Sequence, residues 1–575
     1  MAPTSDGGGT KDESVKDLFD RIGKEVLDKV HDAAKTYTSE LKGDLSKATY
    51  PNDRNSTGST PQDPCQLNHS LHTNVTSGYD NDNPCKNRPN VRFSDVIGGQ
   101  CTDTKIKGND PTNGGACAPF RRLFLCDQNL SHMDENKINN THNLLLEVCL
   151  AAKYEGQSIT QDYPKYRATY NDSPSKMCTM LARSFADIGD IIRGRDLYIR
   201  NKKKDKLEEN LQKIFAKIHG NLKDARTHYS DTDKNYYQLR EDWWTANRAT
   251  IWEAITCEAG GDKYFRATCG GSESPSMARD KCRCDGDQVP TYFDYVPQFL
   301  RWFEEWAEDF CRKKKKKLEN LDTQCRGVDG TGKERYCSRN GFDCEKTIRK
   351  IELLRMGKGC INCLYACNPY VHWIEKQKEQ FEKQKKKYET EISDGGGRKK
   401  RGASKKDYKG YVKQFYEKFQ DEYGNVEEFL KKLNKEGICQ SQPQVGNQKA
   451  DAANFTKDNL AKTFSHTEYC QPCPICGVKR EGDKWITKPD DDKCRIKLYR
   501  PIDGAKRTEI KILKSGDGQT EIENKLNAFC AETNSSSGGG AGGSASNSDS
   551  QKLYDEWKCY QFDQLTNDGQ EGVDD

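Results

Sequence analysis

The sequence predicts a mainly α-helical protein built from several units and held together by disulfide bonds. Most long segments show apolar residues at helical spacing. Apolar residues make up only 33% of the chain and charged residues 32%, so there is little hydrophobic core per residue. The 25 cysteines supply the missing constraint, because so many in so polar a chain are typical of disulfides formed in an oxidising compartment. At 575 residues the chain is too long for one core, and we expect units of roughly 100–200 residues.

The stretch from Arg240 to Cys311 gives the strongest helical signal. It opens with REDWWTANRATIWEAITC (240–257) and closes with VPQFLRWFEEWAEDFC (296–311), and each end has one apolar stripe. Five of the eight tryptophans lie here, and buried aromatic side chains contribute the largest area per residue. We therefore expect two core helices joined by a cysteine-stapled loop. The expected core residues are Trp244, Trp252, Trp302 and Trp306.

The first 60 residues predict a separate segment with one amphipathic helix. Residues 14–37 carry an apolar stripe, and Ser14 is suited to cap the helix because its hydroxyl can accept a hydrogen bond from an unpaired backbone amide. In contrast to most later parts of the chain, this segment has no cysteine. We expect it to dock its stripe onto the next domain.

Five further segments come after it. A loop-rich, cysteine-rich unit precedes a helical bundle. In the next unit, a Gly-rich loop joins two long polar helices (367–392 and 408–433) as an antiparallel hairpin. A linker region with β-like stretches (496–500 and 508–513) and a Gly/Ser tract then leads into the first element of a further domain. The predicted segments are 1–60, 61–175, 176–320, 321–480, 481–552 and 553–575, and the expected variable loops are 155–175, 225–238 and 260–290.

The cysteines are assigned to disulfides. The disulfide candidates are Cys257, Cys269, Cys282, Cys284, Cys311, Cys470, Cys473 and Cys476. Because the count is odd, we expect Cys559 to pair outside this sequence, and a reactive free thiol is the alternative. Two clusters, 360–367 and 470–476, also have spacings that suit zinc, but the remaining cysteines favour an oxidising setting, so we expect no metal.

No motif predicts an enzyme. GVDGTGKE (327–334) has the spacing of a phosphate-binding loop, but Glu334 stands where a Ser or Thr would bind magnesium. Neither HExxH nor GxSxG occurs. The adjacent carboxylates Glu304 and Glu305 are expected on a solvated helix face. We therefore expect no catalytic residue and no cofactor.

Basic residues are clustered, although the net charge is only +4. Such clusters suit a polyanionic partner, and solvated helix faces are the alternative explanation. The candidate binding residues are Lys202, Lys203, Lys204 and Lys206, followed by Lys313, Lys314, Lys315, Lys316 and Lys317. We expect no nucleic-acid partner, because there is no aromatic platform motif and the oxidised cysteines place the chain outside cells.

The sequence shows neither a conventional secretory signal nor a membrane span. The N-terminus lacks a basic segment followed by an apolar run, and no stretch approaches the ~18 apolar residues of a span. Since the cysteines nevertheless indicate an extracellular setting, we expect either part of an ectodomain or a protein exported without an ordinary leader.

Three spaced motifs resemble one known family. They are FADIGDIIRGRDLY (185–198), REDWWTANRATIWEAITC (240–257) and VPQFLRWFEEWAEDFC (296–311). In this order they resemble the alpha class of the Duffy-binding-like (DBL) domain, which heads the erythrocyte membrane protein 1 adhesins (PfEMP1) of Plasmodium falciparum.

The resemblance extends over nearly the whole chain. CNPYVHWIEKQKEQF (367–381) and CQPCPICGVKR (470–480) resemble the third DBL subdomain, and residues 14–40 resemble the N-terminal segment of the family. WKCYQFDQL (557–565) resembles the start of a cysteine-rich interdomain region (CIDR). Between the first and third motifs lie four cysteines, as in the four-cysteine subgroup.

The resemblance implies a fold of three DBL subdomains: loop-rich, helical-bundle and helical-hairpin, with an N-terminal docking helix. It implies a monomeric variant adhesin on the surface of the infected erythrocyte, with a membrane span far downstream and antibodies among its partners. Family members bind heparan sulfate, blood-group sugars or complement receptor one on red cells, which gives rosettes. The alternative is a structural, immune-evasive unit that presents a downstream CIDR to an endothelial receptor. An invasion ligand of the same superfamily is disfavoured by the N-terminal segment and the CIDR stub.

Overall fold

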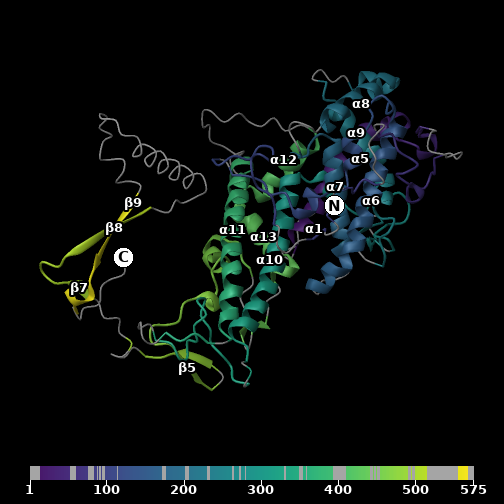
Figure 1. Ribbon diagram of the computed structural model, residues 1–575. Coiled ribbons are helices and arrows are strands. Elements are labelled where there is room, and N and C mark those ends of the chain that lie inside the picture. The colour runs from purple at the N-terminus through teal and green to yellow at the C-terminus, as the bar shows by residue number, and fades with distance from the viewer. Residues whose placement is uncertain are drawn as a thin grey trace, which may run out of the picture. The chain divides into compact units, whose positions relative to one another are not determined.

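The computed structural model describes residues 13–513 and 554–567, with gaps. The gaps are 52–59, 76–82, 87, 90–91, 94–97, 113, 171–175, 201–205, 230–233, 262–263, 271–273, 279, 329, 331, 349–353, 358, 393–409, 441–443, 446–447, 450–452, 483, 490–493 and 495–498. The chain divides into two compact units (Figure 1). Unit 1 comprises Met1–Gly341 and Lys358–Pro472, and unit 2 comprises Phe342–Gly357 and Cys473–Asp575. The six-segment division remains a prediction.

The N-terminal segment forms a docking helix, as predicted. Helix α1 (Val15–Val30) is capped by Ser14, whose side chain accepts from the Asp17 amide while the Asp17 carboxylate accepts from the Ser14 amide. Its apolar stripe is buried against α12 (Tyr411–Tyr423) and α13 (Val426–Leu433). The segment continues through α2 (Asp32–Thr36), α3 (Thr38–Leu41) and the 3-10 turn η1 (Leu45–Lys47).

The loop-rich region contains one long helix whose end the apolar periodicity did not predict. Its short elements are η3 (Pro64–Gln66), α4 (Phe120–Leu123) and α5 (Gln128–Ser131). Helix α6 (Thr141–Tyr170) comes next and is helical well into the stretch expected to be a variable loop. It continues because Tyr163 and Tyr166 on its last turns are buried, which gives that end a packing partner.

Four long helices form the bundle. They are α7 (Lys176–Ile192), α8 (Leu207–Asn221), α9 (Tyr237–Ile255) and α10 (Gln298–Cys325). The connections carry η4 (Asp224–Thr227), β1 (Ala267–Cys269), β2 (Ser276–Met277) and η5 (Phe293–Tyr295). Helix α6 packs on both α7 and α9. The four expected core tryptophans are at most 5% exposed, and Phe185 of α7 contacts the rings of Trp244 and Trp252.

The last part of unit 1 is built on α11 (Ile361–Glu391), which lies beside α10 (Figure 1). The returning limb of the expected hairpin is two helices, because α12 ends at Tyr423 and Asn425 caps α13. Aromatic side chains of α10, α11 and α13, among them Phe303, Phe381 and Phe429, pack together between these helices. The remaining elements are α14 (Gly437–Gln440), β3 (Gln444–Val445), β4 (Gln448–Lys449), η8 (Lys457–Asn459), α15 (Leu460–Thr463) and η9 (Glu468–Cys470).

Unit 2 consists of short antiparallel ribbons. Strand β5 (Val478–Glu481) pairs with β6 (Lys484–Thr487), and β7 (Tyr499–Pro501) pairs with β10 (Leu565–Asn567). Strand β8 (Arg507–Leu513) pairs with β9 (Tyr554–Tyr560), and η10 (Phe562–Gln564) comes after β9. The mainly helical, disulfide-rich fold class is confirmed. Among the described residues, no helix is both long and apolar enough to span a membrane.

Candidate binding surface

Disulfides hold the loops of the described chain in place, and each of the eight candidate cysteines has a partner. The pairs that contain them are Cys65–Cys257, Cys178–Cys282, Cys269–Cys284, Cys311–Cys439, Cys367–Cys470, Cys344–Cys473 and Cys476–Cys494. Four more pairs are Cys85–Cys126, Cys101–Cys117, Cys325–Cys363 and Cys337–Cys360. Two described cysteines are not in disulfides: Cys149, which is buried, and Cys559, which is exposed. Surface loops tied down in this way can present a fixed shape to a partner.

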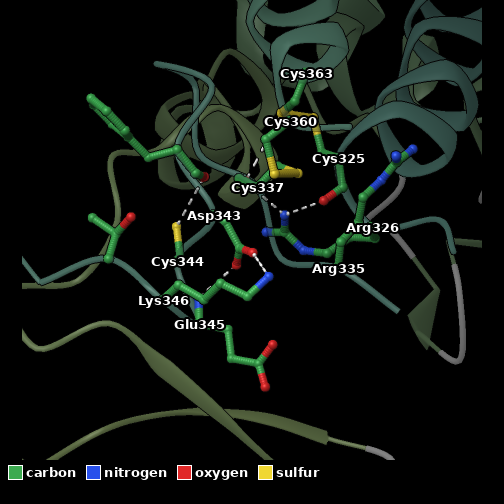
Figure 2. The surroundings of a disulfide bond; sticks show 12 residues. Cys325, Arg326, Arg335, Cys337, Asp343, Cys344, Glu345, Lys346, Cys360 and Cys363 are labelled. Atoms are coloured by element: carbon green, nitrogen blue, oxygen red, sulfur yellow. Dashed lines mark hydrogen bonds and ion pairs between the residues drawn. A yellow bond between two sulfur atoms is a disulfide. The ribbon is translucent and has the colours of Figure 1, made fainter. Parts of the chain in front are cut away.

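The disulfide Cys325–Cys363 joins the end of α10 to the start of α11, and Cys337–Cys360 ties the loop after α10 to the same start (Figure 2). Arg326 lies over this junction and donates to the carbonyl oxygens of Cys325 and Cys337 at 3.1 and 3.0 Å. The sulfurs at positions 325, 363 and 367 lie close enough together to suit a metal, but all three are in disulfides. A sulfur atom in a disulfide cannot serve as the thiolate ligand that zinc requires.

The stretch with phosphate-loop spacing is a turn after the end of α10. Val328 and Glu334 form an isolated antiparallel bridge across it, whereas residues 329 and 331 lie outside the described part. Cys325 and Cys337 flank the turn, and their disulfides tie both of its ends to the start of α11. The turn is therefore a cysteine-tethered loop.

Buried ion pairs connect the helices of unit 1, and sequence reasoning did not find them. Asp187 of α7 accepts from Arg121 at 2.6 Å and from Arg301 at 2.8 Å. Burial raises the pKa of Asp187, but the two guanidinium groups outweigh it and bring the pKa down to about 2. Arg301 also donates to Asp190 at 2.6 Å. The signal in the sequence was the pair of aspartates in DIGD (187–190), on a helix otherwise rich in apolar residues.

The expectation of a solvated face at Glu304 and Glu305 is wrong, since both are buried. Glu304 accepts from Arg183 of α7 at 2.7 Å, and Glu305 accepts from Arg121 at 2.9 Å. Burial raises the pKa of Glu304 to about 8 despite the Arg183 charge. The buried face of α10 is wider than its periodicity indicated, because arginines from neighbouring elements donate hydrogen bonds to the carboxyl groups that lie within it.

A related cluster attaches the N-terminal segment. The Lys16 ammonium of α1 lies 2.8 Å from Glu308 of α10 and 2.9 Å from Glu436, which precedes α14. Burial lowers the pKa of Lys16, but these two carboxylates outweigh it and hold the pKa above its ordinary value. Helix α1 is therefore fixed by charge pairing as well as by its apolar stripe.

The candidate lysines fall into two groups. Lys202, Lys203 and Lys204 lie outside the described residues, and Lys206 is exposed at the start of α8. The second group, 313–317, lies within α10.

The lysines of α10 do not point to one surface. Lys313 is buried and pairs with Asp309 at 2.7 Å, and Lys314 is buried and donates to the Thr463 carbonyl oxygen at 2.8 Å. The Lys316 ammonium lies 5.0 Å from the ring centre of Tyr170 on α6, whereas that of Lys317 lies 5.3 Å from the ring centre of Trp373 on α11. The charges of this run are thus divided between the two flanks of α10, with Lys315 half-buried.

Comparison with known families gives three matches in chain order. The model of the N-terminal segments of PfEMP1 matches residues 14–49. The Duffy binding domain model matches residues 115–301, and the model of the C-terminal subdomain of the Duffy-binding-like domain matches residues 305–468.

Two curated relatives are Duffy receptors. The chain is 25% identical over 284 residues to the Duffy receptor of Plasmodium vivax (strain Salvador I), which covers 47% of this chain and 21% of that protein. It is 21% identical over 295 residues to the Duffy receptor beta form of Plasmodium knowlesi. That alignment covers 49% of this chain and 20% of the relative. The chain thus spans about a fifth of the length of these relatives.

Solved structures are similar over more of the chain. The NTS-DBL1(alpha-1) domain of the PfEMP1 from the varO strain of Plasmodium falciparum is 36% identical, with 83% of this chain and 98% of that chain covered and a TM-score of 0.66. The NTS-DBL1-alpha and CIDR-gamma double domain of the same strain is 35% identical. The match covers 90% of this chain and 73% of that chain, with a TM-score of 0.71. An ICAM-1-binding PfEMP1 DBLbeta domain is 25% identical, with 78% and 96% covered and a TM-score of 0.57.

Proposed function

The chain belongs to the Duffy-binding-like family as the N-terminal head of a PfEMP1, and from this premise we propose that it is an adhesin that binds receptors on host cells. The similarity to the varO NTS-DBL1(alpha-1) domain carries the proposal, because it covers 98% of that domain. The head would face outward from the surface of the infected erythrocyte, act as a monomer and be a target of antibodies.

The relatives and the architecture support adhesion rather than catalysis. The curated relatives are named Duffy receptors, and a DBLbeta relative is described as binding ICAM-1. In the described part of unit 1, the buried charges of α7 and α10 pair with neighbouring side chains and fix helices, so they serve the scaffold. A rigid, disulfide-tied scaffold with polar surfaces suits the presentation of a variable binding face.

For the ligand, we favour sulfated glycans such as heparan sulfate, with blood-group sugars and complement receptor one as further candidates. The clustered lysines would bind sulfate groups by multivalent ion pairing. Such binding weakens steeply with salt, because exposed charges are screened within about 10 Å at 0.1 M salt.

Retention of the full chain on a heparin column, in a salt series, tests the proposal. A variant with Lys202, Lys203, Lys204 and Lys206 changed to Ser should elute at lower salt than the unchanged chain. The matched control changes four exposed lysines of α11 to Ser and alters the net charge equally: Lys376, Lys378, Lys383 and Lys386. Equal losses in the two variants would indicate a non-specific charge effect. No retention of the unchanged chain at low salt would eliminate sulfated glycans as the ligand class.

A second candidate function is the presentation of a downstream CIDR. The varO double domain motivates it, because it contains a CIDR-gamma domain together with NTS-DBL1-alpha and this chain covers 73% of it. If presentation is the main role, the chain by itself will not bind red cells, whereas an adhesin head will bind them in a saturable manner.

A further inference from the structure

Helix α1 carries one buried carboxyl group that has no charged partner. Asp20 is 1% exposed and is the only acidic residue among those that α1 buries. Its Oδ1 accepts from the Tyr292 amide at 2.9 Å and lies 3.5 Å from the Thr291 hydroxyl. Its Oδ2 has no hydrogen-bond partner, and among the described residues no base forms an ion pair with it. Asp20 is therefore held by neutral polar groups alone.

Burial dominates the protonation of this carboxyl group. It raises the pKa of Asp20 to about 7, although the Tyr292 amide, the Tyr264 hydroxyl and Arg266 oppose the shift. Arg266 has only a weak influence, because its guanidinium donates to the Asp17 carbonyl oxygen at 2.7 Å instead of to Asp20. The charge of the Asp17 carboxylate adds to the rise.

The other charges that attach the N-terminal segment pair with residues other than Asp20. They come from α10, α12 and α13, and the pairs are Lys16–Glu308, Arg21–Glu422, Glu25–Lys418 and Glu13–Lys432. On the η5 side, Asp294 pairs with Arg248 at 2.8 Å. None of these pairs supplies a counter-charge to an ionised Asp20.

The backbone approach beside Asp20 is close. A β-carbon built at Gly23, almost one turn along α1, would lie 2.5 Å from the Tyr292 carbonyl oxygen. The helix is thus pressed against the same residue whose amide donates to Asp20. An ionised Asp20 can therefore reach water only if α1 moves away from this backbone.

We propose that one proton on Asp20 controls the docking of the N-terminal segment. The docked helix holds Asp20 as the neutral carboxylic acid, and ionisation weakens docking because a buried carboxylate without a counter-charge is unfavourable. When α1 loosens, the rings that pack on Phe19 become accessible; they belong to Phe415, Phe419 and Phe429. This proposal does not depend on which receptor the head binds.

The direction of the pH dependence follows from the position of the proton. A detached, hydrated Asp20 has the ordinary pKa of 3.8, whereas the docked residue has a pKa of about 7. Between these values the docked helix keeps a proton that the detached helix has lost. Raising the pH through this window therefore weakens docking, by up to about tenfold in the opening equilibrium for each pH unit, and the effect levels off above about pH 7.

Hydrogen exchange of the α1 amides in the full chain tests the proposal. It is measured by mass spectrometry between about pH 5.5 and 7.5 and corrected for the intrinsic exchange rate. Opening of α1 in the unchanged chain should increase more than about tenfold over this range. Asp20→Asn keeps the shape of the side chain but cannot ionise, so it should remove most of that increase. The matched control is Asp28→Asn, since Asp28 is more than half exposed on the same helix, and it should leave the increase unchanged.

Three results would overturn the proposal. One is α1 protection in the unchanged chain that does not fall as the pH rises, whatever the variants do. Another is an equal pH dependence in the unchanged chain and in Asp20→Asn. The third is found by thermal unfolding: Asp20→Asn should be at least as stable as the unchanged chain at about pH 7.5 and lose that advantage at about pH 5.5. An equal loss of stability at both pH values would mean that Asp20 serves only as a hydrogen-bond acceptor.

Discussion

Lys16 is the residue through which charge attaches α1 to the rest of unit 1. Its ammonium lies between Glu308 and Glu436, and both carboxylates are almost fully buried. Removing one partner from a buried ion pair leaves an uncompensated charge, which typically costs about 3–5 kcal/mol. Lys16→Met should therefore lower the free energy of unfolding by about 3 kcal/mol, measured by urea denaturation of the full chain.

Lys24 on the same helix provides the control. It pairs with Asp28 at 2.7 Å, but both side chains are more than half exposed. Exposed pairs contribute little, so Lys24→Met should change stability by less than about 0.5 kcal/mol. Similar effects of the two changes would mean that the buried cluster does not stabilise the docked helix.

At this scale, sequence patterns identified apolar residues more reliably than charged ones. The four tryptophans could be placed in the core because helical spacing put them on one stripe. Glu304 and Lys313 were not recognisable as buried, since periodicity assigns a charged side chain to solvent. Glu304 is buried beside Arg183 and Lys313 beside Asp309. Arg183 lies on another helix, and the periodicity of one helix does not show which residues of another helix it contacts.

Among the elements, α1 lies unusually close to its neighbour, the backbone at Tyr292. A β-carbon built at Gly23 would lie 2.5 Å from the carbonyl oxygen of Tyr292, which is backbone and cannot move aside cheaply. Gly23→Ala should therefore destabilise the chain by pushing α1 outward, although alanine has the higher helix propensity by about 1 kcal/mol. Thermal unfolding of the full chain would measure this.

Gly220 on α8 is the matched position for that change. Nothing lies within 4 Å of a β-carbon built there, and the residue is exposed. Gly220→Ala should raise stability by about 0.5–1 kcal/mol through propensity alone. Opposite signs at the two glycines would support the close approach at α1, and a gain at both would refute it.

The existence of the long helices could be read from the sequence, but not all of their ends. Helix α1 has a capping box and a clear stripe, so its start and face were both predictable. The end of α6 was not, because its last turns are stabilised by rings that pack against Phe93 and against one another rather than by a continuous stripe. Similarly, the break between α12 and α13 depends on Asn425, which caps α13. The polar residues around it continue the helical spacing, so the sequence pattern did not show the break.

For the whole molecule, the sequence predicted that disulfides form but not which cysteines pair. The short motif CQPCPIC shows why. Cys470 pairs with Cys367 within unit 1, whereas Cys473 and Cys476 pair with Cys344 and Cys494 within unit 2. The folding of the chain decides which cysteines meet, and spacing alone does not reveal it.

The connectivity makes a quantitative prediction about stability. Cys65–Cys257 joins residues 192 positions apart, whereas Cys101–Cys117 joins residues 16 apart. A cross-link stabilises the folded protein mainly by lowering the conformational entropy of the unfolded chain. This effect grows with the logarithm of the number of residues in the loop that the cross-link closes. Replacing Cys65 and Cys257 by Ala should therefore lower the free energy of unfolding by about 2 kcal/mol more than replacing Cys101 and Cys117. Urea unfolding of the two double variants would measure the difference. Equal losses would indicate that local packing around each disulfide, rather than chain entropy, determines its contribution to stability. Disulfides between distant residues would then stabilise this scaffold no more than disulfides between near ones.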